Sequence, residues 1–217
     1  SFQQTVESLN RMGMTTVYDV GGNTVMPDHY NAVHRAHEND ELNMRVFYTI
    51  NDRNQDLATP EKIITVLQGN TPDNNGLKVA RFGYGESIYR TIRATPFVVS
   101  DEDWDHLYDI AIAAADNGWQ MNEHSSRDIK IQAMLDVFER VNATHPITDL
   151  RWTIAHNNTT SPESVRRGIE LGMMFAVHAS RRNVSAAQME NGGEAALHQP
   201  PFRTIHELGA VWGLGSD

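Results

Sequence analysis

Two short apolar runs that both end in histidine decide the fold: Trp119-Gln120-Met121-Asn122-Glu123-His124 and Leu150-Arg151-Trp152-Thr153-Ile154-Ala155-His156. Between them, residues 127–141 carry apolar side chains at helical spacing, namely Ile131, Met134, Leu135 and Phe138. Two strands separated by a helix of this length indicate a parallel βαβ unit, because a hairpin would need only a short turn.

The same alternation continues on both sides of this unit. We expect strands over 15–20, 44–50, 77–81, 119–124, 150–156, 173–178 and 211–217. We expect helices over 101–117, over 127–141, and from Ser161-Pro162 to Leu171-Gly172, where serine caps the helix and proline lies in its first turn. Segments 51–75 and 181–200 are rich in Asn, Gln, Pro and Gly, and we interpret them as loops over the active face.

Seven strand–helix units fit either a barrel or a doubly wound open sheet. Gly21-Gly22 lacks the third glycine of a dinucleotide-binding turn. Polar residues recur at the carboxyl ends of the expected strands, where barrels place their chemistry. The α/β pattern therefore favours a (β/α)8 TIM barrel of which strands 2 to 8 are represented. Such a barrel has two unpaired edges, which isolated domains avoid.

Composition limits the functions that this chain can have. Its 217 residues fit one domain, and a net charge of −10 argues against nucleic acid and against anionic membrane surfaces as partners. The chain has no apolar run near the roughly 20 residues of a membrane helix. The opening residues do not resemble a signal peptide, so we expect a cytoplasmic protein unless an export signal lies outside this sequence.

The chain has no cysteine and ten histidines, so a transition metal would have to be held by histidine and carboxylate. His124, His156 and Asp217 each end an expected strand, and strand ends converge at one mouth of a barrel. Imidazoles with a carboxylate are the ligand set of a zinc-type hydrolase, although a lone strand-end histidine is more often structural. His178 ends the strand after that of His156, and is either a substrate contact or a packed histidine.

His34 and His37 lie three residues apart on an expected helix over 28–40. We interpret them as part of a solvated helix face in preference to a surface metal site. Trp119 and Trp152 precede the two strand-end histidines, and we expect both in the core.

Several segments together resemble the amidohydrolase superfamily, most closely its YtcJ-like branch, amidohydrolase family 3. The opening segment Met12-Gly13-Met14-Thr15-Thr16-Val17-Tyr18-Asp19 is similar to the second barrel strand of that family. The other matching segments, in chain order, are 120–124 with Asp128 and 134–136, then 151–156, Leu171-Gly172-Met173, and Gly213-Leu214-Gly215-Ser216-Asp217. The resemblance covers essentially the whole chain.

The resemblance implies a metal-dependent hydrolase that acts on amide or related C–N bonds of a small molecule. It implies a divalent metal, with Zn²⁺ as the expected ion. His124 and His156 match the ligands on family strands five and six, and Asp217 matches the strand-eight aspartate that holds the metal and transfers the proton of water. Lys78 falls near the strand-four position of a carboxylated lysine, but Phe82-Gly83 replaces the usual Asp-Gly that follows.

The sequence also departs from that family. The first-strand His-x-His, the small β-domain and everything after Asp217 are absent from residues 1–217, so we infer one partial barrel domain excerpted from a longer polypeptide. The competing interpretation is a catalytically incomplete barrel fragment or pseudoenzyme that acts by binding a partner or as a homo-oligomer through its two sheet edges.

Overall fold

The computed structural model describes residues 2–19, 31–51, 60–69, 79–85, 101–178, 193 and 198–215. In this part of the chain, one parallel sheet has the strand order β1-β2-β3-β4-β5-β6-β7. The strands are β1 (Thr16–Asp19), β2 (Arg45–Asn51), β3 (Val79–Gly85), β4 (Met121–Ser125), β5 (Thr153–His156), β6 (Met174–His178) and β7 (Val211–Gly215). The parallel sheet predicted from the strand–helix alternation is confirmed.

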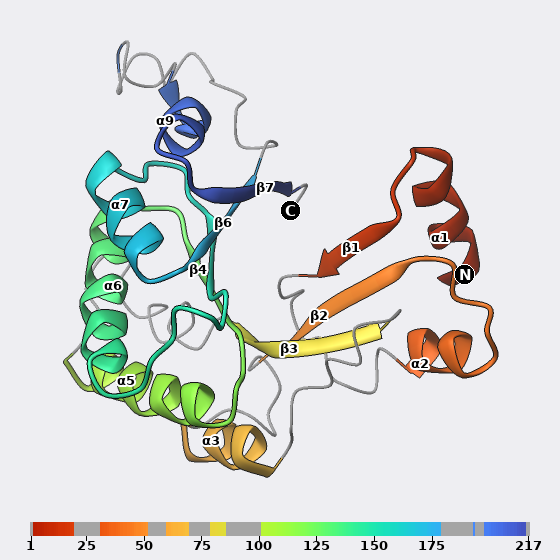
Figure 1. Cartoon of the computed structure of the whole chain (residues 1–217), viewed down its shortest axis with the longest axis horizontal. Helices are drawn as coiled ribbons and strands as arrows, with labels where there is room; N and C mark the ends of the chain where they lie inside the picture. Colours follow the sequence, from red (N-terminus) through yellow and green to blue (C-terminus); the bar gives the residue numbers. More distant parts are fainter. Residues whose placement is uncertain are drawn as a thin grey trace.

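Helices connect or flank these strands (Figure 1). They are α1 (Phe2–Arg11), α2 (Asn31–Glu38), α3 (Pro60–Gly69), α5 (Asp101–Asp116), α6 (Asp128–Asn142), α7 (Pro162–Glu170) and α9 (Phe202–Glu207). Ser161 caps α7 as predicted, because its hydroxyl accepts a hydrogen bond from the backbone N–H of Ser164 at 3.2 Å. None of the helices described is long and apolar enough to cross a lipid bilayer.

The sheet is an open portion of a barrel, with β1 and β7 as its two edges. In Figure 1, α5, α6 and α7 cover the outer side of the part formed by β4 to β7, while α1 and α2 lie beside β1 and β2. Strands β1 to β7 therefore represent strands 2 to 8 of a (β/α)8 barrel, as the sequence predicted.

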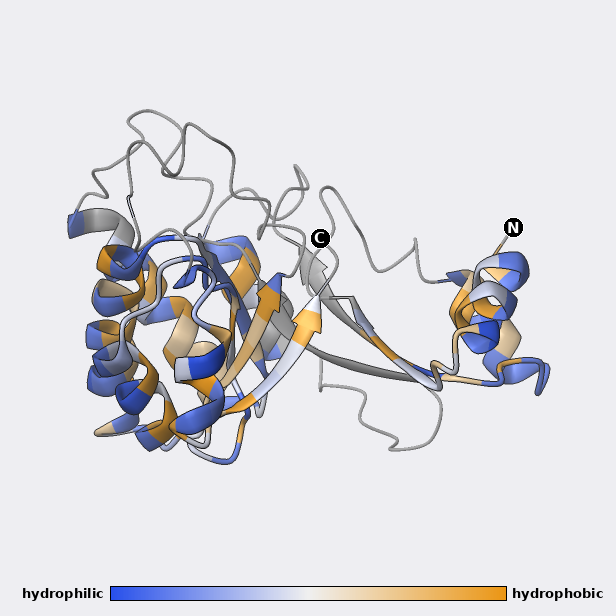
Figure 2. Cartoon of the chain, turned by 90° about the horizontal axis from the view of Figure 1, so that it is seen from above, coloured by the Kyte–Doolittle hydropathy of each residue, from blue (hydrophilic) through white to orange (hydrophobic). Residues whose placement is uncertain are grey.

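Two hydrophobic clusters hold these elements together. The larger cluster joins α5, α6 and α7 to β4, β5 and β6, and the helices alternate hydrophobic and hydrophilic residues as amphipathic helices do (Figure 2). The smaller cluster contains Val6, Val33, Ala36, Leu42, Met44 and Val46. Trp119 and Trp152 are both buried in the larger cluster, as expected, and the indole N–H of Trp152 donates a hydrogen bond to the carbonyl of Trp119 at 2.9 Å.

The prediction that 51–75 is a loop throughout was wrong, because α3 occupies residues 60–69. Proline begins this helix, Glu61 lies in its first turn, and Ile63 is buried in the larger cluster. The polar residues on both sides of this short amphipathic segment masked its periodicity. A second helix, α9, was not predicted, and its six residues bury Ile205.

Most of segment 181–200 lies outside the described residues, as do Lys78, Asp217 and Ser216. The strand expected over 77–81 is described from Val79 to Gly85. The strand expected over 211–217 is described as far as Gly215.

Candidate functional site

Three histidines lie at the carboxyl ends of three neighbouring strands. His124 is the penultimate residue of β4, His156 is the last residue of β5, and His178 is the last residue of β6. His156 and His178 are buried, and His124 is half-buried. The sequence placed these residues at equivalent strand ends, and the structure brings their rings into contact.

The three imidazoles form a row. The Nδ1 atom of His124 lies 3.0 Å from Nε2 of His156, and the centroids of these rings are 4.9 Å apart at an interplanar angle of 67°. The rings of His156 and His178 meet edge to face, with centroids 4.2 Å apart. His156 is therefore the central member, in contact with both of the others.

The amide of Asn122 lies at one end of this row, beside His124. Its Nδ2 atom lies 3.3 Å from Nε2 of His124. The two residues are two positions apart in β4, so their side chains lie on the same face of the strand. Which ring nitrogen of His124 donates and which accepts depends on its tautomer, and binding of a metal at Nδ1 requires the tautomer that carries its proton on Nε2.

Strand alternation alone would not bring His156 to His124. In the parallel register, His124 lies opposite Ala155, and His156 lies opposite Ser125, on the other face of the sheet. Ile154, two residues before His156, packs in the cluster between sheet and helices. A regular β5 would therefore direct the imidazole of His156 toward the helices and away from His124.

A left-handed backbone turn reverses this direction. His156 has φ of 77° and the following Asn157 has φ of 55°, values that non-glycine residues rarely adopt. The turn takes the His156 side chain out of the strand alternation, so that its Nε2 reaches Nδ1 of His124. The sequence analysis missed this feature, and the pair Asn157-Asn158 was its available signal, since asparagine is the side chain that best tolerates this conformation.

The loops that follow His124 and His156 are braced against each other. The Asp128 carboxylate accepts a hydrogen bond from the backbone N–H of Ser161 at 2.7 Å. The backbone N–H of Asp128 donates to Oγ1 of Thr159 at 3.2 Å, and that hydroxyl donates to the carbonyl of Ser126 at 3.3 Å. These bonds fix the β4–α6 loop to the β5–α7 loop at the rim that carries the histidines.

The donor set formed by His124 and His156 fits a metal ion. Two imidazole nitrogens on one tetrahedral zinc, each about 2.0–2.1 Å from it, are separated by about 3.3 Å. The observed nitrogen–nitrogen separation of 3.0 Å is within a few tenths of an ångström of that value. Among the residues that the structure describes, no three His, Cys, Asp or Glu side chains are placed to hold a metal together, so further ligands would have to come from elsewhere.

The structure does not place Asp217 or Lys78, which lie outside the described residues. It does place the chain just before Asp217. Gly215 is paired with His178 in the register of β6 and β7, so the described chain of β7 ends at the rim that carries the three histidines.

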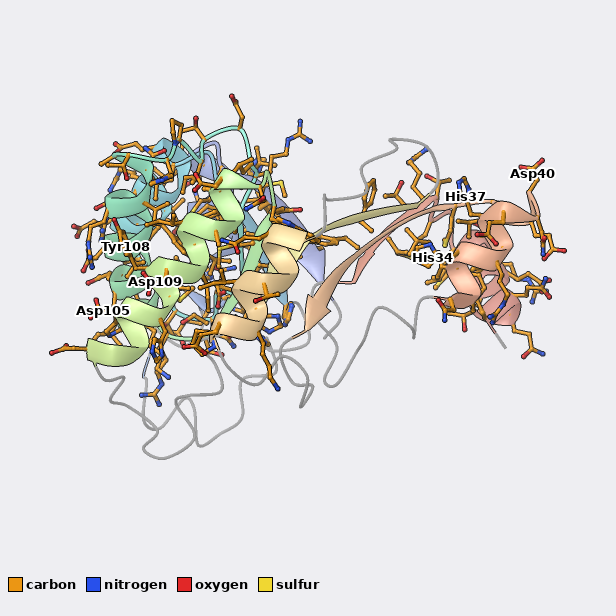
Figure 3. All side chains as sticks on the ribbon, turned by 90° about the horizontal axis from the view of Figure 1, so that it is seen from below. His34, His37, Asp40, Asp105, Tyr108 and Asp109 are labelled. Atoms are coloured by element: carbon orange, nitrogen blue, oxygen red, sulfur yellow. The ribbon has the colours of Figure 1, made fainter. Side chains whose placement is uncertain are left out.

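His34 and His37 belong to a different part of the molecule. Figure 3 shows both on α2, far from α5, which carries Asp105, Tyr108 and Asp109. Both histidines are half-buried, so the helix face that they share is less solvated than expected.

Comparison with known proteins agrees with this fold. The model of the Amidohydrolase family matches residues 1–217, and the chain belongs to that family. No curated protein matches it significantly.

Solved structures of similar fold include an uncharacterised metal-dependent hydrolase from Pyrococcus furiosus, with 18% identity and a TM-score of 0.68 over 99% of this chain and 45% of the other. The guanine deaminase of C. acetobutylicum, solved with guanine in its active site, has 10% identity and a TM-score of 0.57 over 100% and 49%. A mutant of the atrazine chlorohydrolase of Arthrobacter aurescens, in complex with zinc and atraton, has 15% identity and a TM-score of 0.56 over 98% and 47%. The chain thus spans less than half the length of each of these proteins.

Proposed function

We propose that the full protein is a metal-dependent hydrolase that uses water to cleave an amide or other C–N bond of a small molecule. The observation that carries this proposal is the 3.0 Å approach of Nδ1 of His124 to Nε2 of His156 at the carboxyl rim of the barrel. Membership of the Amidohydrolase family supports the same chemistry.

His124 and His156 would bind a divalent metal, for which we propose Zn²⁺. A bound metal ion of this kind lowers the pKa of a coordinated water to about 7 and so supplies a nucleophile at neutral pH. Asp217, two residues beyond the last described residue of β7, is proposed to complete the ligand set. Lys78 directly precedes Val79, where β3 begins, and the carboxyl end of β3 at Gly85 is the end level with β4 near the histidines, so Lys78 is not retained as a ligand. Neutral imidazoles with carboxylate-type oxygens suit zinc in a site that keeps open positions.

The chain's own residues would then handle the substrate and the proton. Asp217 is proposed to accept the proton of the attacking water and to pass it to the leaving nitrogen, which is general acid–base catalysis. His178 is proposed to contact the substrate, because its ring lies against His156 at the same rim. The names of the similar structures, a guanine deaminase and an atrazine chlorohydrolase, support a small-molecule substrate.

The metal content and amidase activity of the full-length protein test this proposal, with His156→Ala as the key variant. We expect the variant to lose bound zinc and to lose activity by at least about 100-fold. His198→Ala is the matched control, because His198 is exposed and lies outside the histidine row. Unchanged zinc and unchanged turnover in His156→Ala would overturn the proposal.

The second candidate function is that of a catalytically incomplete fragment that self-associates. Val211 and Leu214 favour it, because both side chains are about two-thirds exposed on the edge strand β7. The mass of the purified native protein separates the two candidates. A mass near 24.4 kDa, together with oligomers in solution, supports the fragment, whereas a chain about twice as long supports the hydrolase.

A further inference from the structure

We propose that Asn157 is a positioning residue: its side chain holds the left-handed turn that brings His156 into the barrel beside His124. The expected effect of Asn157 on metal binding rests on the proposed function. The structural part of the inference, the placement of the His156 ring, is independent of that function.

Asn157 connects three strands at the point where His156 leaves β5. It is fully buried, and its backbone N–H donates to the carbonyl of Ser125 in β4 at 3.0 Å. Its Nδ2 donates to the carbonyl of Ile154 in β5 at 2.6 Å and to the carbonyl of Ala176 in β6 at 3.2 Å. Both protons of the amide nitrogen are therefore used.

The amide oxygen is used as well. The Oγ1 atom of Thr160, which is buried, donates to Oδ1 of Asn157 at 3.2 Å. A buried amide with partners for both of its ends has one orientation, because rotation by 180° would place its oxygen against two carbonyl oxygens. The side chain thereby fixes the backbone from which it projects, and that backbone is the left-handed pair of His156 and Asn157.

No other residue type supplies the same set of bonds. Aspartate would place a carboxylate oxygen against the carbonyls of Ile154 and Ala176, which is repulsive. Glycine would adopt the left-handed backbone easily but would remove all three side-chain hydrogen bonds. The comparison of glycine with asparagine therefore separates backbone tolerance from side-chain positioning.

Asn157 would act on the metal only through His156. Residues that orient metal ligands typically change metal affinity by about 10–100-fold when they are substituted. A ring that leaves its position would also lose the hydrogen bond between His124 and His156, which can be observed without a metal.

The test compares Asn157→Gly with Asn142→Gly in the full-length protein. Asn142, at the end of α6, is a matched control. Its side chain also accepts a partly buried hydrogen bond, from the backbone N–H of Ile147 at 3.0 Å. Two quantities are measured: zinc affinity by competition with a chromophoric chelator, and the ring ¹⁵N chemical shifts of His124 and His156 in metal-free protein.

We expect Asn157→Gly to lower zinc affinity by about 10–100-fold and to shift the ring nitrogens of both histidines, while Asn142→Gly changes neither. Thr160→Val serves as a second variant if Asn157→Gly does not fold, since it removes only the partner of Oδ1, and a smaller change in the same direction is expected. Ring shifts like those of the wild type in the folded variants would overturn the positioning role. A wild-type protein that binds no zinc would instead overturn the proposed function, and the ring shifts would still test Asn157.

Discussion

The imidazole of His178 lies directly against the backbone of Gly215. A Cβ atom built on Gly215 would be 2.7 Å from Cδ2 and 3.1 Å from Nε2 of this ring. The two residues are register partners in β6 and β7, so the missing side chain of Gly215 is what allows the ring to lie across the end of β7. The same ring also contacts His156, so Gly215 helps to set the position of the histidine row.

Gly215→Ala is expected to displace His178. Contacts closer than about 3.0 Å are not tolerated between carbon atoms, so the ring must move and lose its packing on His156. If His178 contacts the substrate, the variant raises KM by about 10-fold, with a smaller change in kcat.

Gly213→Ala is the control for this prediction, because a Cβ on Gly213 in the same strand has no neighbour within 4 Å. Steady-state kinetics of both variants is the measurement. Equal KM values for the two variants would contradict a substrate contact by His178.

Gly172→Ala is expected to destabilise the protein strongly. Gly172 has φ of 68°, and a Cβ there would clash with the backbone carbonyl of Thr148. Backbone strain alone costs about 1 kcal/mol for an alanine in this conformation, and the clash with a backbone atom adds to it.

Gly209→Ala separates the two costs, since Gly209 has φ of 78° and open space around it. Thermal or urea unfolding should give a loss of about 1 kcal/mol for Gly209→Ala and of at least about 3 kcal/mol for Gly172→Ala. Similar losses for the two variants would mean that the clash with Thr148 contributes little to the loss of stability.

Trp152→Phe tests the end of β5 opposite to the histidines. The substitution removes the indole N–H that donates to the carbonyl of Trp119 and leaves a cavity beside Phe138, whose ring centroid is 5.0 Å away. We expect a loss of about 2–3 kcal/mol in the free energy of unfolding. Trp212→Phe, at a half-buried position of β7, is the comparison. A loss as large there would show that the buried hydrogen bond of Trp152 contributes little.

Arg167 links α7 to α6 through Glu139 at 2.7 Å and Asp136 at 2.6 Å. The hydrogen bond to Glu139 is the main cause that raises the pKa of Arg167 above its usual value, against desolvation, which lowers it. A cationic group whose pKa is higher in the folded than in the unfolded protein contributes stability at every pH below its pKa in the unfolded chain. Since the pKa of an arginine in the unfolded chain already lies well above pH 10, this contribution stays constant from pH 7 to pH 10.

Arg167→Gln is therefore expected to lose up to about 1 kcal/mol at low salt, equally at pH 7 and pH 10, and less in 1 M salt. Arg203→Gln, in an exposed pair with Glu207, is expected to change stability less. Urea unfolding at the two pH values measures both variants. A loss that grew between pH 7 and pH 10 would show that another titrating group carries the effect.

The parallel sheet was predictable because short apolar runs are separated from one another by helix-length segments. The central strands β4 and β5 are buried along almost their whole length, as an interior parallel strand requires. The bounds of α6 and α7 followed from local signals, the apolar spacing over 131–138 and the cap at Ser161. Helix α3 was missed because its ten residues stand among polar neighbours, and what identifies it is the burial of Ile63 against other elements.

The candidate site was predictable in part. Each of His124, His156 and His178 was placed at the end of its strand, and parallel strands bring such ends to one rim. The register was not predictable from one sequence, and it shows that His156 is out of phase with His124 in a regular strand.

The sequence by itself therefore determined which residues gather at the rim, since strand order and direction follow from local patterns of apolarity and helix length. The tertiary structure alone decided that the rings meet. That contact depends on a left-handed turn at His156 and Asn157, held by hydrogen bonds to three strands. Those bonds join residues up to 32 positions apart, so no local pattern could encode them.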